Sequence, residues 1–192
     1  MPNLYIIAGP NGAGKTTASY TILPEILNCY EFVNADEIAR GISPLQPEKA
    51  SFEAGKLMLT QVKKHVELGL DFAIETTLST RTYAELIENA QRKGYRVTLL
   101  FFWLVNFEAA KTRVAKRVEE GGHNIPGDVI ERRYKRGLFN LFNVFLPLCD
   151  GWMLIDNNFE TKSIAQNMGG NEKVFEKEKF EHIKTEAKKY EY

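Results

Sequence analysis

Short apolar runs recur along the chain, and each is followed by a longer stretch whose apolar residues recur at helical spacing. The runs are almost continuous in apolar side chains, which is typical of parallel strands that are covered on both faces. They lie at residues 4–8, 31–33, 71–75, 95–104 and 152–155. The stretches between them predict helices at about residues 15–23, 35–40, 47–69, 80–93, 107–120 and 126–146. This alternation predicts an α/β fold of three layers, with a mostly parallel sheet of about five strands between helices.

The organisation of the chain is that of one domain with a tail. No linker divides residues 1–170, so we expect a single domain there. Residues 171–192 are rich in Lys and Glu at helical spacing and predict a charged C-terminal helical tail, which follows a possible hinge at residues 169–171. Within the predicted helix 47–69, the apolar side chains near helical spacing are Phe52, Leu57, Leu59, Val62 and Val66.

Composition narrows the class of protein. The 192 residues include 25 Lys plus Arg and 25 Asp plus Glu, so the net charge is zero, which argues against a partner bound by a general basic surface such as nucleic acid. Cys29 and Cys149 are far apart and lack a CxxC partner, as expected of reduced thiols. We find no signal-peptide pattern and no apolar run near the roughly 20 residues that span a membrane. We therefore expect a cytoplasmic protein without a membrane partner.

The loop after the first strand carries the strongest chemical signal. Residues 9–16 match G-x-x-x-x-G-K-[ST], between an apolar strand and a helix. Such a loop turns backbone N–H groups toward a phosphate at the positive end of a helix. Lys15 is expected at the β- and γ-phosphates of ATP or GTP, and Thr16 at Mg²⁺. The predicted nucleotide-binding residues are Gly9, Asn11, Gly12, Ala13, Gly14, Lys15, Thr16 and Thr17.

Polar residues follow the second and third strands at what should be the same edge of the sheet. A kinase needs a carboxylate near the acceptor hydroxyl, and we assign Asp36 to that role. Glu75 closes an apolar run and is suited either to substrate hydroxyls or to Mg²⁺ held through water. The predicted substrate-binding residues are Asn34, Asp36, Glu75, Thr76, Thr77, Arg81 and Arg133.

Basic residues on two successive helices predict a lid. Arg113, Lys116 and Arg117 share one helix face, and Arg132, Arg133 and Arg136 follow beyond Gly121-Gly122. Together they suggest a helical lid at about residues 113–133 that closes over the nucleotide. Arg117 and Arg132 are the predicted catalytic cations, beside Lys15 and Asp36. We expect His123 to be a loop residue rather than a base.

The ordered set of motifs resembles the zeta-toxin family. The set comprises residues 9–16, Asn34-Ala35-Asp36-Glu37-Ile38-Ala39, Glu75-Thr76-Thr77-Leu78-Ser79 and 121–126, and the resemblance spans roughly residues 4–157. It implies an adenylate-kinase-like P-loop fold and phosphoryl transfer to a sugar hydroxyl, as of UDP-N-acetylglucosamine. It also implies that Asp36 is the base, that Glu75 binds substrate, and that Arg117 with Arg132 or Arg133 touches the transferred phosphate. An antitoxin partner is compatible with the family, but the motifs themselves do not require one.

The sequence is compatible with two other functions. The chain has the features of a nucleotide-gated binding module that hydrolyses slowly and acts through a protein partner. A kinase of polynucleotide ends shares the fold class, although the balanced charge argues against it.

Overall fold

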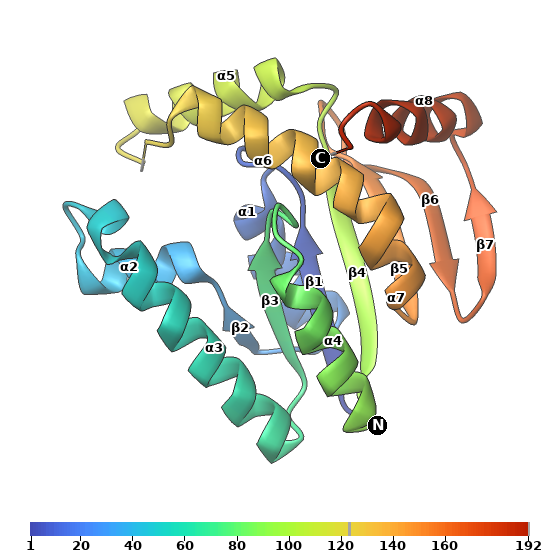
Figure 1. Ribbon diagram of the computed structural model, residues 1–192, viewed down its shortest axis with the longest axis horizontal. Helices are drawn as coiled ribbons and strands as arrows, with labels where there is room; N and C mark the ends of the chain where they lie inside the picture. Colours follow the sequence, from blue (N-terminus) through green and yellow to red (C-terminus); the bar gives the residue numbers. More distant parts are fainter. Residues whose placement is uncertain (123, 192) are drawn as a thin grey trace.

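A single mixed sheet forms the centre of the molecule (Figure 1). The structure is a computed structural model that describes residues 1–122 and 124–191, and within these residues seven strands have the order β2-β3-β1-β4-β5-β6-β7. The first five strands along the chain are mutually parallel, whereas β6 and β7 are antiparallel additions at one edge. The strands are β1 (Asn3–Ala8), β2 (Glu31–Val33), β3 (Phe72–Thr76), β4 (Arg96–Trp103), β5 (Gly151–Asp156), β6 (Lys162–Met168) and β7 (Asn171–Val174).

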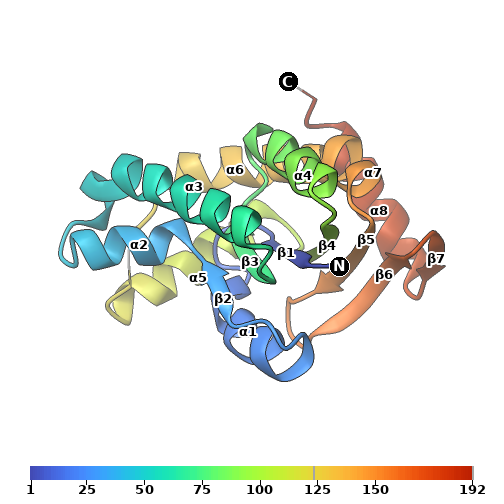
Figure 2. The same ribbon diagram turned by 90° about the horizontal axis from the view of Figure 1, so that it is seen from below.

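Helices cover both faces of this sheet, which Figure 2 shows end-on. The α-helices are α1 (Lys15–Thr21), α2 (Ala35–Ile42), α3 (Ser51–Leu68), α4 (Thr82–Arg92), α5 (Phe107–Glu119), α6 (Gly127–Asn140), α7 (Leu146–Leu148) and α8 (Lys177–Lys188). Shorter helical segments lie at Ile22–Ile26, Pro47–Ala50 and Leu141–Phe145. Buried residues of α3, α4, α6 and α8 share one core, and those of α5 contribute to the core on the opposite face, against which Ala18 of α1 packs. The expected three-layer α/β architecture is therefore confirmed.

The sheet is larger than the sequence pattern predicted. We expected about five strands, and the structure adds β6 and β7. In β6 only Ile164 and Ala165 are buried, and β7 is exposed along its length. Edge strands with so few buried side chains lack the apolar run on which the prediction depended. Their hydrogen-bonded pairing with the rest of the sheet forms only in the folded molecule.

The C-terminal segment differs from the predicted helical tail. Residues 171–174 form β7, and the helix begins only at Lys177. Gly169 and Gly170 form the turn between β6 and β7. Phe180 and Ile183 of α8 are buried in the same core as the main sheet, where Phe180 stacks on Trp152. Pairing with β6 across the Gly169–Gly170 turn thus overrides the helical pattern of residues 171–174.

Helix α3 buries only part of its predicted apolar set: Val62 is buried and Val66 packs against the core. Phe52, Leu57 and Leu59 are exposed, and Phe52 retains 76% of its accessible surface. The buried residues are Ala54, Met58, Val62 and His65. Their spacing of three and four residues forms one continuous stripe, which decides the orientation of the helix against the sheet.

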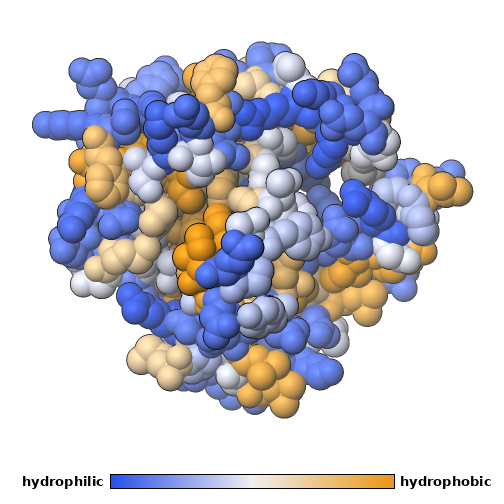
Figure 3. Space-filling view, turned by 180° about the vertical axis from the view of Figure 1, so that it is seen from behind, coloured by the Kyte–Doolittle hydropathy of each residue, from blue (hydrophilic) through white to orange (hydrophobic). Residues whose placement is uncertain are grey.

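Exposed apolar side chains occur in separate groups on the face shown in Figure 3, while hydrophilic residues predominate along its upper rim. No helix among the described residues is long and apolar enough to cross a membrane.

Candidate functional site

The carboxyl ends of β2, β3 and β1 meet at one edge of the sheet. Because β3 lies between the other two, its last residues face segments that leave both neighbours. The loop after β1 leads into α1, and Asn34 follows β2. Figure 1 shows α5 and α6 crossing above these strand ends. The fold therefore brings the predicted phosphate loop and the predicted acceptor residues to the same place.

The backbone of the phosphate loop adopts conformations that favour glycine. Gly9, Gly12 and Gly14 all have positive φ, and Gly14 caps α1 at φ 75°. A Cβ on Gly14 would lie 2.9 Å from Nδ2 of Asn157, which donates to the Ala13 carbonyl at 2.7 Å. The loop after β5 thus braces the phosphate loop from outside. Sequence analysis missed Asn157, because nothing local links it to residues 9–16.

Glu75 is the centre of a buried polar cluster. Its Oε2 accepts hydrogen bonds from Oγ1 of Thr16 at 2.7 Å and from Nδ2 of Asn34 at 2.9 Å. The ammonium of Lys15 lies 3.6 Å from Oε1 and donates to the Pro10 carbonyl at 3.0 Å. The side chains of Lys15 and Glu75 are only 6% and 10% exposed. One carboxylate therefore joins the phosphate loop to the residue that begins α2.

The charges around Lys15 show which other groups are close to it. Burial lowers the pKa of Lys15, the negative charges of Glu75 and Asp36 raise it, and the positive charge of Arg117 lowers it. Asp36 is exposed in the first turn of α2, and its N–H donates to Oδ1 of Asn34 at 2.8 Å. Both the predicted base and one predicted lid arginine thus act on the phosphate loop electrostatically.

The predicted nucleotide and Mg²⁺ sites fit the residues that are present. Gly9, Gly12 and Gly14 have the positive φ angles that favour glycine in a phosphate-binding turn, and Oδ1 of Asn11 is buried without a hydrogen-bond partner among the described residues. Thr16 and Glu75 supply the oxygens suited to Mg²⁺. The described residues contain no cluster of three metal-binding His, Cys, Asp or Glu side chains, so these two residues would hold the ion together with phosphate oxygens and water. Thr17 is exposed on α1.

The segment after β3 is held by its own side chains. Oγ1 of Thr76 accepts from the Leu78 N–H at 3.1 Å, and Oγ1 of Thr77 donates to Ser79 at 3.0 Å. Tyr83 lies close by: burial raises the pKa of its phenol, a hydrogen bond to Thr76 lowers it, and the charge of Asp36 raises it. Sequence analysis missed Tyr83, whose only signal is its position just beyond the predicted acceptor residues.

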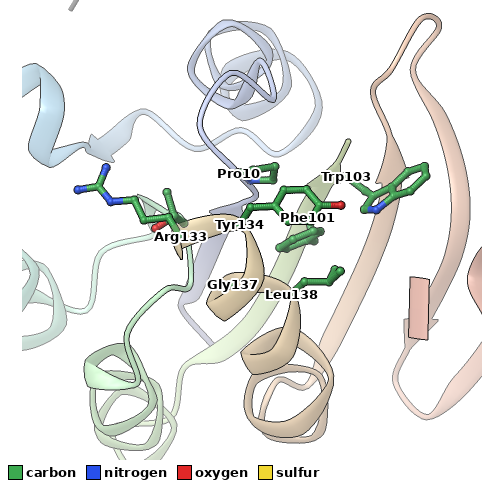
Figure 4. A pocket seen from close by; sticks show the side chains of 8 residues that line it. Pro10, Phe101, Trp103, Arg133, Tyr134, Gly137 and Leu138 are labelled. Carbon is green, nitrogen blue, oxygen red and sulfur yellow. The ribbon is translucent and has the colours of Figure 1, made fainter. Parts of the chain in front are cut away.

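The predicted lid arginines do not all reach the site. Arg113 donates to the Asn158 carbonyl, so it holds the loop after β5. Arg133 lines a small hollow together with Pro10 and Thr77, and in Figure 4 its side chain runs toward the side on which β2 and α2 lie. Arg132 and Arg136 are exposed on α6. His123, which we expected to be a loop residue, lies outside the described residues.

Comparison with known proteins identifies the family. The family model described as "Zeta toxin" matches residues 1–144. The chain belongs to the zeta toxin family. It is accordingly a P-loop kinase, a class of phosphotransferase. A relative from Haemophilus influenzae described as an uncharacterized protein is 28% identical over 126 residues, which are 66% of this chain and 88% of the relative.

Solved structures agree on the fold of this zeta toxin family member. The toxin–antitoxin system PezAT of Streptococcus pneumoniae includes a chain with a TM-score of 0.69 and 19% identity, over 99% of this chain and 87% of that one. The AvrRxo1-ORF1:-ORF2 complex with ATP includes a chain with a TM-score of 0.75 and 19% identity. That match covers 95% of this chain but only 63% of the AvrRxo1 chain. A sugar kinase from Janibacter matches at a TM-score of 0.51 and 20% identity, over 83% of this chain and 88% of that one.

Proposed function

We propose that this zeta-toxin-family kinase transfers the γ-phosphoryl group of ATP or GTP to a hydroxyl of a small molecule. A nucleotide sugar such as UDP-N-acetylglucosamine is the first acceptor to test. The observation that carries the proposal is the Glu75 cluster, in which Lys15, Thr16 and Asn34 converge on one buried carboxylate. ATP as the donor is supported further by the solved complex of the AvrRxo1 chain with ATP.

In this proposal the residues at the strand ends have different catalytic and binding roles. Lys15 and the N–H groups of residues 9–16 bind the nucleotide phosphates, and Thr16 and Glu75 would hold Mg²⁺, which would neutralise part of the phosphate charge. Asp36 accepts the proton of the attacking hydroxyl. Its exposure at the start of α2 suits a group that meets a substrate from solvent.

The cations assigned to the transferred phosphate are Arg117 and Arg133. Arg117 is close enough to affect the pKa of Lys15, and Arg133 lines the same hollow as Pro10 and Thr77. Arg132, the neighbour that sequence analysis favoured, is exposed. We therefore assign to Arg133 the role first given to Arg132. Asn34, Thr76, Thr77, Arg81 and Tyr83 are the proposed acceptor-binding residues.

The decisive experiment measures label transfer from γ-labelled ATP with Mg²⁺ to a panel of hydroxyl compounds led by UDP-N-acetylglucosamine. We expect label on one panel member, and a loss of about a thousandfold in Asp36→Asn, because the amide accepts no proton. Glu37→Gln is the matched control, since Glu37 follows directly on α2 and pairs with Arg40 at 3.3 Å. Absence of label on every compound, with nucleotide binding intact, would favour a binding module instead.

An inhibitory protein partner is a second proposal. It is supported by the Streptococcus pneumoniae relative, which is described as part of a toxin–antitoxin system. If this chain is the toxin of such a system, expression of the wild-type protein alone should arrest bacterial growth. Expression of the Asp36→Asn variant alone should not. Equal growth of both strains at equal protein levels would contradict the proposal.

A further inference from the structure

The acceptor loop, which we define as residues 76–81, has a strained backbone at its centre. Leu78 has φ 55°, in the left-handed region that a branched apolar residue rarely adopts, and its side chain is fully buried. Such a conformation persists only where the surrounding structure holds it in place. The Thr77 hydroxyl contact is internal to the loop, whereas the Thr76 hydroxyl contacts both the Leu78 N–H within the loop and Tyr83 of α4 just beyond it.

Helix α6 supplies the external support. Nδ2 of Asn140 donates to the Leu78 carbonyl at 2.7 Å, and the Asn140 side chain is completely buried. Oδ1 of the same residue accepts from Nε of Arg81 at 3.4 Å. One amide thus contacts the loop at its strained centre and at its end.

Close backbone contact places α6 directly on the same loop. A Cβ on Gly137 would lie 2.3 Å from the Thr77 carbonyl oxygen, so only glycine permits this approach. Gly137 and Arg133 are four residues apart and line the same hollow (Figure 4). Tyr134 adds a buried hydrogen bond from its hydroxyl to the Leu104 carbonyl at 2.9 Å. From Tyr134 to Asn140, α6 is therefore fixed to the sheet edge.

We propose that Asn140 is a positioning residue for the acceptor side of the site. Through the Leu78 carbonyl and Arg81, it holds the acceptor loop in register with Arg133 on the same helix. Asn140 itself touches neither substrate nor nucleotide. The kinetic part of this inference rests on the proposed function, whereas the structural part, that Asn140 holds the loop, does not.

Hydrogen–deuterium exchange of the ligand-free protein tests the structural part. In Asn140→Ala, the Leu78 carbonyl loses a buried donor, and we expect exchange across residues 76–81 to rise about tenfold while residues 9–16 stay unchanged. Asn143→Ala is the matched control, because Nδ2 of Asn143 also donates to a backbone carbonyl, that of Phe139, but on the exposed side of the helix. If Asn140→Ala does not fold, Asn140→Asp preserves side-chain volume and the acceptor for Arg81 while removing the donor. Unchanged loop exchange in the folded variant would overturn the proposal.

Steady-state kinetics with the panel member that wild type phosphorylates test the positioning role. We expect the acceptor KM to rise about tenfold in Asn140→Ala, with the KM for ATP within about twofold of wild type. Faster loop exchange with an unchanged acceptor KM would show a merely structural role and overturn the assignment. Failure of wild type to phosphorylate any panel member would count against the proposed function, while the exchange experiment would still decide whether Asn140 holds the loop.

Discussion

The two sides of the site are built in different ways. On the phosphate side, Lys15, Thr16 and Asn34 come within 3.6, 2.7 and 2.9 Å of Glu75. On the arginine side, the cations are spread along α5 and α6: Arg113 holds the Asn158 carbonyl, and Arg132 is exposed. Adjacent strands fix the first group, whereas two helices joined by a loop present the second. The predicted phosphate-binding groups thus lie at the ends of adjacent strands, and the predicted catalytic cations lie on two helices.

The loop after β5 connects these two sides. Asn157 donates to Ala13 in the phosphate loop, and the carbonyl of Asn158 accepts from Arg113 on α5. Asp156 holds the base of this loop, since it accepts from the N–H of Asn158 at 2.9 Å and from Lys179 of α8 at 2.8 Å. The C-terminal helix, which sequence analysis treated as a tail, therefore supports the nucleotide side of the site.

The largest effect is expected from a substitution at Glu75, the centre of the phosphate side. Glu75→Gln preserves shape but removes the charge opposite Lys15 and Thr16, so we expect kcat to fall about a thousandfold. A magnesium titration of the variant separates the two roles left open for Glu75. A Mg²⁺ requirement shifted to higher concentration assigns Glu75 to the metal; an unchanged requirement with a raised acceptor KM assigns it to the substrate.

A smaller effect distinguishes neighbours on the arginine side. We expect Arg133→Ala to lower kcat about a hundredfold, because Arg133 lines the hollow beside the phosphate loop. Arg132→Ala is the matched control and should stay within about twofold of wild type, since its side chain is exposed. Steady-state rates at saturating ATP and acceptor measure both variants. The reverse order would return the catalytic role to Arg132.

The smallest effect concerns the connection between the two sides and depends on pH. Although burial alone would raise the pKa of Asp156, hydrogen bonds from Lys179 and Asn158 lower it overall. Its contribution to stability is therefore fully present above the unfolded pKa of about 3.9 and is lost as pH falls through the lower folded value. We expect Asp156→Asn to cost about 1 kcal/mol at pH 7, because Lys179 is partly exposed to solvent. Denaturant unfolding at pH 7 and below pH 4 measures the difference, which should shrink in acid; a constant difference would contradict the assignment.

Much of the phosphate side was predictable because its signals are local. The G-x-x-x-x-G-K-T loop occupies consecutive residues, and Asp36 and Glu75 directly follow apolar runs. Since parallel strands end at one edge of the sheet, the sequence predicted that Lys15, Asn34 and Glu75 lie together. The structure places Glu75 in contact with both of the others.

The arginine side was less predictable, because helical spacing shows which residues share a face of the helix but not which part of the protein that face packs against. Six basic residues on two helices offered several registers, and the packing of Gly137 and Tyr134 selects the one that places Arg133 beside Pro10 and Thr77 and leaves Arg132 exposed. Asn140 carries no local signal, since its partner Leu78 is distant in sequence, and Tyr83 has only its position just beyond the predicted acceptor residues.

By itself, the sequence determined the order of strands and helices, the phosphate loop and the carboxylates beside it, because each depends on periodicity or on consecutive residues. Only the tertiary structure decided that β6 and β7 extend the sheet, that α3 buries Ala54 and Met58 rather than Phe52, and that Asn140 holds Leu78. Those outcomes depend on which surfaces meet across the sheet. For α3 and Asn140, contacts between residues far apart in the chain set that choice. Strands β6 and β7 pair with their neighbours along the chain, but they have too few buried side chains to show an apolar run.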